Sequence, residues 1–283
     1  RAIRVHEHGG PDALRYEAVP RPDVGEDEIL VRVRAAGVNP IDWLVREGYA
    51  DDALDPALPY VPGWDVSGVV ETVGADVAAF DRGDEVFGLV RLPDAGETYA
   101  EYAAVPATDV VRKPPSLSHS VAAAVPMVGL TARRALFEEG DLQRGERVLV
   151  HAAAGGVGHV AVQLATRVGA HVVDLVVDAV GVDTLERSVD VLAGGGRLVT
   201  LPEPPSAKID ARARDRDATA HWFSVEPDAA RLADLRTLLD QGDLEVTVSD
   251  TWPLPKAPAA QEESRRGHVR GKLVLEVDGD SGA

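Results

Sequence analysis

The sequence predicts two domains: an all-β domain, and an α/β domain built on a doubly wound parallel sheet. The chain has 283 residues, which is enough for two hydrophobic cores. Short apolar segments separated by Gly, Pro and Asp fill residues 1–115, as is typical of strands joined by turns. From about residue 120 helical and strand-like segments alternate, which indicates a parallel sheet covered by helices.

The strands expected in the first domain are rich in β-branched residues and end at turn-forming residues. They are ALRYEAVPRP (13–22), EILVRVRAAGV (28–38), DVSGVVETVG (65–74), DEVFGLV (84–90) and TYAEYAAVP (98–106). We expect this domain to cover residues 1–120 and the chain to return to it over residues 257–283, as a helix and a final strand.

The second domain, expected over residues 121–256, alternates helices with buried strands. Helical spacing marks residues 120–140, 155–169 and 227–242. The expected strands are ERVLVHAA (146–153), DLVVDAV (174–180), GRLVTL (196–201), HWFSV (221–225) and LEVTVSDTWPL (244–254).

The net charge and the lack of cysteine exclude several classes of protein. A formal net charge of −18 argues against binding to nucleic acid or to anionic membranes. No apolar run is long enough to span a membrane and no signal peptide is visible, so we expect a cytoplasmic protein. With no Cys, the chain has no disulfide and no thiolate metal site, and its eight His residues show no HExxH spacing.

The acidic composition predicts a halophilic protein. Asp and Glu number 47, whereas Lys occurs only at positions 113, 208, 256 and 272. A strongly charged surface keeps a protein soluble. The alternative is an ordinary acidic enzyme encoded by a GC-rich genome, which would also favour Arg over Lys.

A glycine-rich turn between a strand and a helix indicates a dinucleotide site. Ala153, Gly155 and Gly158 match the G-x-G-x-x-G pattern, with Ala in the first position. Small residues let the backbone approach a pyrophosphate, and the helix that begins near Val157 offers free N–H groups and a partial positive charge. A tight strand-to-helix turn without a ligand is the alternative. The candidate cofactor-binding residues of this turn are Ala154, Gly155, Gly156, Val157 and Gly158.

Eight segments along the chain carry a resemblance to a known family. They are AAGVNPIDW (35–43), VPGWDVSGVVETVG (61–74), GDEVFG (83–88), TYAEYAAVP (98–106), AAAVPMVGLTA (122–132), AAAGGVG (152–158), GGGRLVTL (194–201) and GHVRGKLVLEV (267–277). Together they resemble the medium-chain dehydrogenase/reductase superfamily, in its zinc-independent quinone oxidoreductase (zeta-crystallin-like) branch. The resemblance implies a GroES-like β-barrel catalytic domain and a Rossmann nucleotide-binding domain with a doubly wound parallel sheet.

The resemblance also implies that the catalytic zinc is absent. Zinc alcohol dehydrogenases of this superfamily carry Cys at the position of Asn39 and a His-Glu pair at the positions of Trp64 and Asp65. Their third ligand falls near Val128, which cannot coordinate a metal. The usual Lewis acid is therefore not expected here.

Three catalytic candidates follow from the resemblance. Asn39 is expected beside the nicotinamide, where its amide can donate to a developing oxyanion; a turn-capping Asn before Pro40 is the alternative. Thr131 is expected to hydrogen-bond the nicotinamide end, unless it bonds its own helix backbone. Tyr49 is a candidate to line the substrate cleft, with simple packing as the alternative, because the family often has Tyr one position later and another at the place of Leu44.

Further cofactor contacts are expected from backbone groups at strand ends. They map to Val180, Gly181, Leu201, Phe223 and Val225. Lys272 is expected to reach the cofactor or the cleft, and a solvated Lys beside a strand is the alternative. Trp43 and Trp64 are either apolar cleft residues or core residues.

The segment AHVVDLVVDAVGV (170–182) contains two strand-like pieces with nothing between them. In a sheet of order 3-2-1-4-5-6, they are expected as strands two and four, on opposite sides of strand one. One peptide step of ~3.8 Å cannot join them. We therefore predict that roughly 40–50 residues, the length of a βα unit with its flanking helix, are absent between Val173 and Asp174. The sequence leaves open whether they are disordered and omitted from the chain or lost from the gene. The residues that recognise the ribose 2′-position of the cofactor would lie in this absent segment.

The resemblance implies hydride transfer from NADPH, with NADH possible, to a quinone or an α,β-unsaturated carbonyl in the cleft between the domains. The alternatives are an enoyl, alkenal or ketone reductase, and a nucleotide-binding protein without turnover. We expect no nucleic-acid or membrane partner, and a homodimer or homotetramer in which LEVTVSDTWPL supplies an edge of the nucleotide domain.

Overall fold

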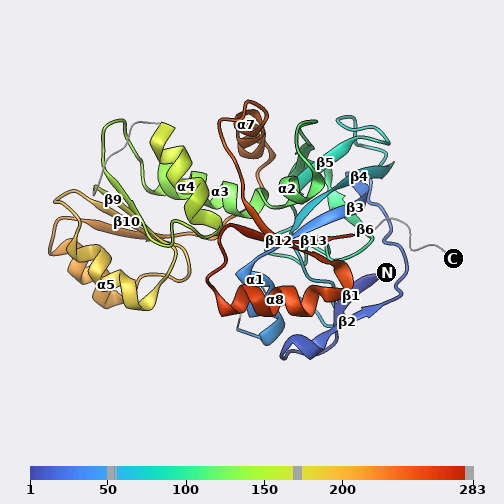
Figure 1. The fold of residues 1–283 in the computed structure, drawn as a ribbon, viewed down its shortest axis with the longest axis horizontal. Coiled ribbons are helices and arrows are strands. Elements are labelled where there is room, and N and C mark those ends of the chain that lie inside the picture. Colours follow the sequence, from blue (N-terminus) through green and yellow to red (C-terminus); the bar gives the residue numbers. More distant parts are fainter. Residues whose placement is uncertain (50–53, 55, 168–173, 278–283) are drawn as a thin grey trace. The chain divides into compact units, whose positions relative to one another are not determined.

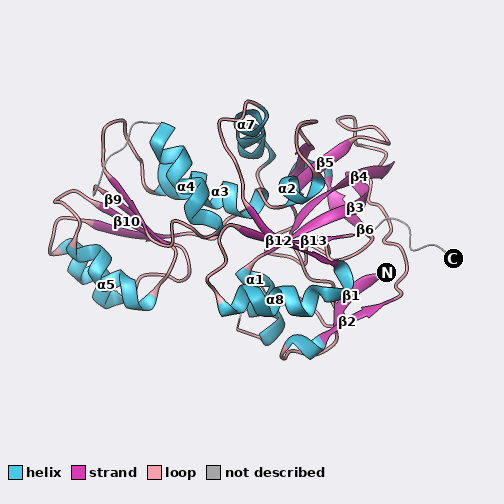
Figure 2. Cartoon of the chain, in the orientation of Figure 1, coloured by secondary structure: helices cyan, strands magenta, loops and turns pink. Residues whose placement is uncertain are grey.

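The structure, a computed structural model, describes residues 1–49, 54, 56–167 and 174–277. The chain divides into two compact units, one made of Arg1–Met127 with Glu226–Ala283 and the other of Val128–Val225. Figure 1 shows the course of the chain through these units, and Figure 2 marks the helices and strands in each. No helix within the described ranges is long and apolar enough to cross a membrane.

The first unit is built mainly on antiparallel strands, where the sequence predicts an all-β domain. A small sheet pairs β1 with β2, and the larger sheet has the order β12-β13-β3-β4-β5-β7, with β6 also pairing with β3. Only β12 and β13 run parallel among these pairs of described strands. The strands are β1 (Ala2–Val5), β2 (Leu14–Glu17), β3 (Glu28–Val38), β4 (Asp65–Val73), β5 (Glu85–Leu89), β6 (Tyr102–Pro106), β7 (Val110–Arg112), β12 (Val248–Pro253) and β13 (Lys272–Glu276).

Helices pack around this larger sheet. Helix α8 lies beside α1 and β13, and α2 lies against β3 and β4 (Figure 1). The helices of the unit are α1 (Pro40–Glu47), α2 (His119–Ala123), α7 (Ala229–Asp240) and α8 (Ala257–Arg266), with short 3-10 turns at Pro11–Ala13, Ala107–Asp109 and Leu254–Lys256. Helix α3 (Pro126–Arg134) crosses the boundary between the units.

The central strand β3 brings two strand ends to one place. Its partner β13 is aligned so that Leu273 lies opposite Val38, which sets Lys272 opposite Asn39. On the other side, Val66 lies opposite Ala36, so Asp65 comes next to Gly37. Antiparallel neighbours on both sides of one strand thus place side chains from three distant segments together.

The second unit contains four parallel strands in the order β11-β10-β9-β8. This order matches strands 1, 4, 5 and 6 of a doubly wound sheet. The elements are a π-helical turn at Ala135–Glu139, β8 (Val148–Val150), α4 (Gly156–Arg167), β9 (Leu175–Asp178), α5 (Val182–Asp190), β10 (Arg197–Thr200), α6 (Ala207–Arg214) and β11 (Thr219–Trp222). The predicted strand at 170–173 lies outside the described residues.

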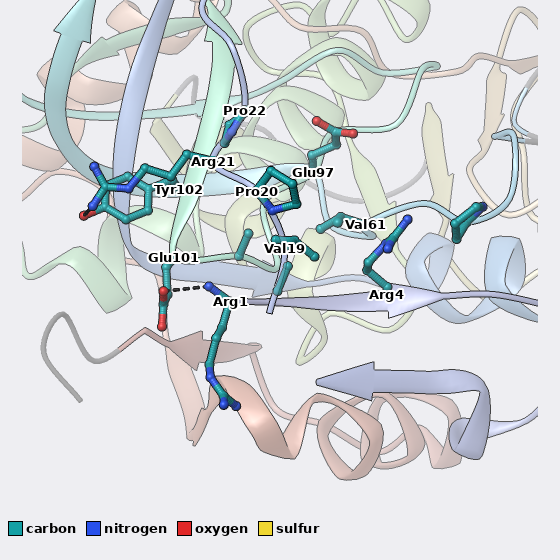
Figure 3. Close-up of a pocket in the computed structure, with 13 residues that line it drawn as sticks. Arg1, Arg4, Val19, Pro20, Arg21, Pro22, Val61, Glu97, Glu101 and Tyr102 are labelled. Atoms are coloured by element: carbon teal, nitrogen blue, oxygen red, sulfur yellow. Dashed lines mark hydrogen bonds and ion pairs between the residues drawn. The ribbon is translucent and has the colours of Figure 1, made fainter. Parts of the chain in front are cut away.

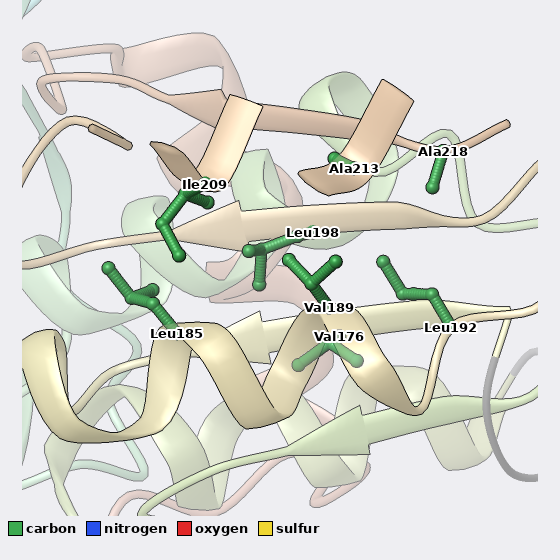
Figure 4. Packing of buried hydrophobic residues seen from close by; sticks show 8 residues of the cluster. All are labelled: Val176, Leu185, Val189, Leu192, Leu198, Ile209, Ala213 and Ala218. Atoms are coloured by element: carbon green, nitrogen blue, oxygen red, sulfur yellow. The ribbon is translucent and has the colours of Figure 1, made fainter. Parts of the chain in front are cut away.

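The core of this unit lies between its sheet and helices α5 and α6 (Figure 4). Helix α5 contributes Leu185 and Val189, and Leu192 follows at its end, a spacing that puts all three on one helix face. They pack with Val176 of β9 and Leu198 of β10. Helices α5 and α6 and the strands that they cover therefore bury one continuous apolar layer.

The domain boundaries expected from the sequence differ from these units. The segment LEVTVSDTWPL was expected at an edge of the nucleotide sheet, but β12 pairs with β13 in the first unit. Helix α7 also belongs to the first unit, so the change of unit falls at 225/226 and not at 256/257. The first change falls at 127/128 and not at 120/121.

Three helices, α1, α5 and α6, were not assigned from the sequence. Helix α1 interrupts a region expected to be all β, and begins directly after Asn39 with Pro40 in its first turn. This is a usual helix start, since Pro lacks the N–H that would be unsatisfied there. Helix α6 begins after Ser206, whose hydroxyl accepts the Ile209 N–H.

Gly37 is expected to be sensitive to substitution. A Cβ at this position would lie 2.6 Å from the Ala123 carbonyl oxygen and 2.7 Å from Asp65 Oδ2. We expect Gly37→Ala to lower the free energy of unfolding by about 1–3 kcal/mol, as overpacking usually does. Urea unfolding measures this, with Gly10→Ala as the control, because a Cβ at Gly10 meets nothing within 4 Å. Equal effects in the two variants would contradict the close approach at Gly37.

Candidate functional site

Asn39 lies between the end of β3 and the start of α1 and is only 2% exposed. Its backbone N–H donates to Asp42 Oδ2 at 2.7 Å, which secures the start of the helix. Asn39 is the N-cap residue of α1, but the side chain that bonds the backbone at this helix start is that of Asp42. The side chain of Asn39 has other partners.

The Asn39 amide is held from both sides. Its Nδ2 donates to Asp65 Oδ2 at 2.8 Å, and its Oδ1 accepts from Lys272 Nζ at 2.5 Å. Lys272 also donates to the Val38 carbonyl oxygen at 2.7 Å, and its Nζ lies 3.6 Å from Asp65 Oδ2. Asp65 in turn accepts the Met127 N–H at 2.7 Å. Lys272 is 4% exposed, so the alternative of a solvated Lys is wrong.

Burial changes the ionisation of this cluster. It raises the pKa of Asp65, and the opposing charge of Lys272 limits the rise. It lowers the pKa of Lys272, opposed by the charges of Asp65 and Asp42. One ammonium faces two carboxyl groups. Its Nζ lies 3.6 Å from Asp65 Oδ2, so Lys272 and Asp65 form the ion pair.

Asp42 is the second buried carboxyl of the cluster. Burial raises its pKa to about 7, although the Asn39 N–H, the Tyr99 hydroxyl and the charge of Lys272 act against the rise. Tyr99 donates to Asp42 Oδ2 at 2.7 Å, and burial together with the charge of Asp42 raises the pKa of Tyr99. Neither Asp42 nor Tyr99 was singled out from the sequence; an acid three residues after Asn39, at the third position of a helix, was the available signal.

The glycine-rich turn in the second unit is built as the sequence predicts. Helix α4 begins at Gly156, so its first N–H groups point towards the turn that holds Ala154 and Gly155. A Cβ on Gly158 would lie 2.2 Å from the Ala152 carbonyl oxygen, and one on Gly155 would lie 3.2 Å from it. Val157 follows in the first turn of the helix. Small residues are therefore required here, and the helix start is suited to a pyrophosphate.

Asp178 organises the strand end where Val180 and Gly181 were predicted to contact the cofactor. Its Oδ1 accepts both of their N–H groups, at 2.9 and 3.0 Å, and its carboxylate also accepts from the hydroxyls of Thr184 and Ser188. Burial acts to raise the pKa of Asp178, but the N–H and hydroxyl hydrogen bonds together lower it. The N–H groups of Val180 and Gly181 are thus occupied. Val180 itself is 51% exposed.

The other predicted backbone positions of the second unit differ in accessibility. The Leu201 N–H donates to the Asp178 carbonyl oxygen at 2.9 Å, which joins it to the same strand end. The Phe223 ring is buried under the Arg134 guanidinium, 4.7 Å from its centroid, and Val225 is half-buried. Thr131 is buried on α3.

The aromatic candidates separate clearly. Tyr49 is 73% exposed, so the packing alternative is wrong for this ring. Trp64 is 1% exposed and donates to the Asp94 carbonyl oxygen at 2.7 Å, which makes it a core residue. Trp43 is half-buried on α1. The structure therefore joins Asn39 and Lys272 in one cluster of the first unit, while Tyr49 stands apart from it on the surface.

The residues around Asn39 do not suit a zinc ion. The ammonium of Lys272 stands where a cation would face Asp65 and Asn39, and Trp64 and Val128 offer no ligand. Across the described ranges, no group of three or more His, Cys, Asp or Glu side chains is arranged to hold a metal.

A separate cavity of about 390 Å³ lies in the first unit, away from this cluster (Figure 3). Its walls include Arg4, Arg21, Glu97 and Tyr102, with the Arg21 guanidinium over the Tyr102 ring. None of the predicted site residues lines it. We assign it no part in the chemistry.

Asp42 predicts an unusual dependence of stability on pH. Between its ordinary pKa of 3.8 and about 7, the folded protein keeps a proton that the unfolded chain has released. The free energy of unfolding contributed by Asp42 therefore falls as the pH rises through this range. We expect the stability of Asp42→Asn, relative to the wild type, to be greater at about pH 8 than at about pH 4, because the neutral amide does not lose this contribution. Urea unfolding at fixed KCl checks this; a stability difference that is the same at both pH values would contradict it.

Known proteins resemble this chain over both units. Residues 25–115 match the family described as alcohol dehydrogenase GroES-like domain, and residues 156–275 match the one described as zinc-binding dehydrogenase. The quinone oxidoreductase of Lama guanicoe is 32% identical over 97% of this chain and 97% of its own length.

Three solved structures share the fold. The quinone oxidoreductase from Coxiella burnetii has a TM-score of 0.92 and 32% identity, covering 98% of this chain and 99% of that one. The Escherichia coli quinone oxidoreductase complexed with NADPH has a TM-score of 0.86 and 26% identity, covering 97% and 99%. The CurK enoyl reductase has a TM-score of 0.87 and 26% identity, covering 98% and 99%.

The comparison also bears on the predicted missing segment. The alignment with the Lama guanicoe protein spans 326 positions, while 97% of this 283-residue chain is about 275 residues. Roughly 50 positions therefore have no counterpart in this chain, which agrees in size with the predicted gap. Its place between Val173 and Asp174 stays a prediction, because residues 168–173 lie outside the described residues.

The similarity covers nearly the whole chain, and the GroES-like match precedes the dehydrogenase match, as the order of the sequence motifs predicts. The chain belongs to the medium-chain dehydrogenase/reductase superfamily, in its zinc-independent quinone oxidoreductase branch.

Proposed function

We propose that this protein is a zinc-free, NADPH-dependent reductase that transfers a hydride to a quinone or to the β-carbon of an α,β-unsaturated carbonyl. The observation that carries the proposal is the full-length similarity to quinone oxidoreductases, one of which is solved with NADPH. The Lys272 ammonium at the position suited to a cation supports a reaction without zinc.

The residues that would hold the cofactor belong to two sets. The pyrophosphate would rest on the start of α4 and on the small residues of the preceding turn, Gly155 and Gly158 foremost. The nicotinamide end would be held by Thr131, by the carbonyl of Val180 and by backbone groups of Leu201, Phe223 and Val225. Reduced nicotinamide supplies a hydride to the acceptor when bound.

Asn39 would stabilise the oxygen of the acceptor as it gains negative charge. Its Nδ2 carries two hydrogens, and one of them is donated to Asp65. The second can be donated to the substrate oxygen without a change of charge on the protein. The remaining proton would come from water. Tyr49, which is exposed, would contact the acceptor only at the rim of its site.

An enoyl or alkenal reductase is the second candidate, favoured by the similarity to the CurK enoyl reductase. Ketone reduction and nucleotide binding without turnover complete the set of alternatives. An absorbance assay of NADPH and NADH oxidation, with a panel of quinones, enones and ketones at low and high KCl, distinguishes these candidate functions. Turnover of quinones or of enones supports the proposal, turnover of ketones alone would favour ketone reduction, and binding of NADPH without oxidation by any acceptor would overturn the proposal.

We expect Asn39→Ala to lower kcat for the preferred acceptor by roughly 10- to 100-fold, because one donor to the oxyanion is lost. The Kd for NADPH should change much less, since the amide is not required for pyrophosphate binding. Stopped-flow turnover and NADPH fluorescence titration measure the two quantities, and thermal unfolding shows whether the variant is folded. Unchanged turnover would remove Asn39 from the mechanism.

We also propose that the protein is a halophilic cytoplasmic enzyme and a homodimer or homotetramer. Its net charge of −18 and its scarcity of Lys support the first part. Self-repulsion of the acidic surface should weaken as salt screens it. Tm is therefore expected to rise with KCl concentration, and a Tm that does not depend on KCl would show an ordinary acidic protein.

A further inference from the structure

We infer that Lys272 is a positioning residue, which together with Asp65 fixes the Asn39 amide in one orientation, and that it does not bind the cofactor. This inference rests on the proposed role of Asn39 as a donor to the substrate oxygen. It replaces the expectation from the sequence that Lys272 itself reaches the cofactor.

The chemistry of the two neighbours leaves one orientation for the amide. An ammonium can only donate hydrogen bonds, and an ionised carboxylate can only accept them. Lys272 therefore requires Asn39 Oδ1, and Asp65 requires Asn39 Nδ2, as the distances of 2.5 and 2.8 Å show. Rotating the amide by half a turn would place its N–H groups against the ammonium and its oxygen against the carboxylate. The donor face of Asn39 is thus held by charge as well as by packing.

The donors of Lys272 are directed at groups of the protein. Nζ carries three hydrogens: two are donated to the Val38 carbonyl oxygen and to Asn39 Oδ1, and Asp65 Oδ2 lies 3.6 Å away at an ion-pair distance. These partners all belong to the protein, so the geometry directs the ammonium at the amide and the carboxylate and not at a phosphate or a carboxamide. The antiparallel register of β13 on β3 holds the ammonium opposite Asn39.

A buried ion pair is a costly way to stabilise a fold. Desolvation of the two charges offsets much of their attraction, and apolar replacements of the same volume are often as stable. Orientation of a neighbouring amide is a role that an apolar pair could not fill. The pair is therefore explained by what it does to Asn39.

The test uses two variants. One is the single substitution Lys272→Met, and the other is the neutral pair, in which Asp65→Asn and Lys272→Met are combined. Each variant is made in the wild-type chain and in the Asn39→Ala background. The neutral pair keeps the test decisive if the single variant, which leaves Asp65 unpaired, does not fold. Lys113→Met is the matched control, because Lys113 is also a buried lysine of the first unit and donates to the carbonyl oxygens of Pro114 and Leu117.

In Lys272→Met and in the neutral pair we expect kcat to fall by about 10-fold or more, while the Kd for NADPH stays within about twofold of the wild-type value. In the Asn39→Ala background, removing Lys272 should cause no further loss of kcat, since there is no amide left to orient. A raised Kd for NADPH with kcat retained would show that Lys272 contacts the cofactor and would overturn the inference. An equal loss of kcat in Lys113→Met would do the same, because it would show a general effect of losing a buried lysine.

A second readout does not depend on turnover. Asn39 is the one asparagine in the 283 residues, so labelling asparagine side chains with ¹⁵N gives a single amide to follow by NMR. In the wild type its two protons should be distinct and slow to exchange, and in the Lys272 variants they should exchange faster. Unchanged chemical shifts and exchange rates of the Asn39 amide in the Lys272 variants would refute the orienting role. Full activity of Asn39→Ala, by contrast, would count only against the proposed function of Asn39.

Discussion

The buried ion pair between Lys272 and Asp65 is the interaction on which the arrangement around Asn39 depends. It joins the first residue of β13 to the first residue of β4, with the end of β3 between them. Gly37 makes this possible, since a side chain there would collide with Asp65 and with the backbone at Ala123. Three segments far apart in the sequence are thereby fixed around one amide.

The second unit uses a buried carboxylate for a similar purpose. Asp178 binds the N–H groups of Val180 and Gly181, and hydroxyls from α5 bind the same carboxylate. The chain leaves β9 in a fixed shape, with its N–H groups satisfied. A carboxylate at the end of a strand can therefore hold a loop that carries no side-chain chemistry of its own. In each unit a buried carboxylate, Asp65 or Asp178, thus serves structure and position, which fits a reaction whose hydride comes from a cofactor.

The sequence determined most of the architecture, because the periodicity of apolar residues is a local signal. Strands β2 to β6 and β13 of the first unit, the glycine-rich turn, α4 and the parallel strands β8 to β10 lie where that pattern predicts them, whereas β1 and β7 were not predicted. The assignment of β12 to the nucleotide sheet was wrong, since the pattern of a strand does not tell which strand it will pair with. The absence of an expected segment could be inferred, because the reach of one peptide bond limits where two strands can lie.

For the site, the sequence by itself determined which residue types are available: a lone Asn before a helix, small residues at a helix start, and no thiolate ligand. The tertiary structure alone decided how they act. Lys272 follows Asn39 by 233 residues, and only the register of β13 on β3 sets the two side chains together. The tertiary structure also places Trp64 in the core and Tyr49 on the surface. Burial then changes what each group can do, because a charge away from water must find its partner within the protein.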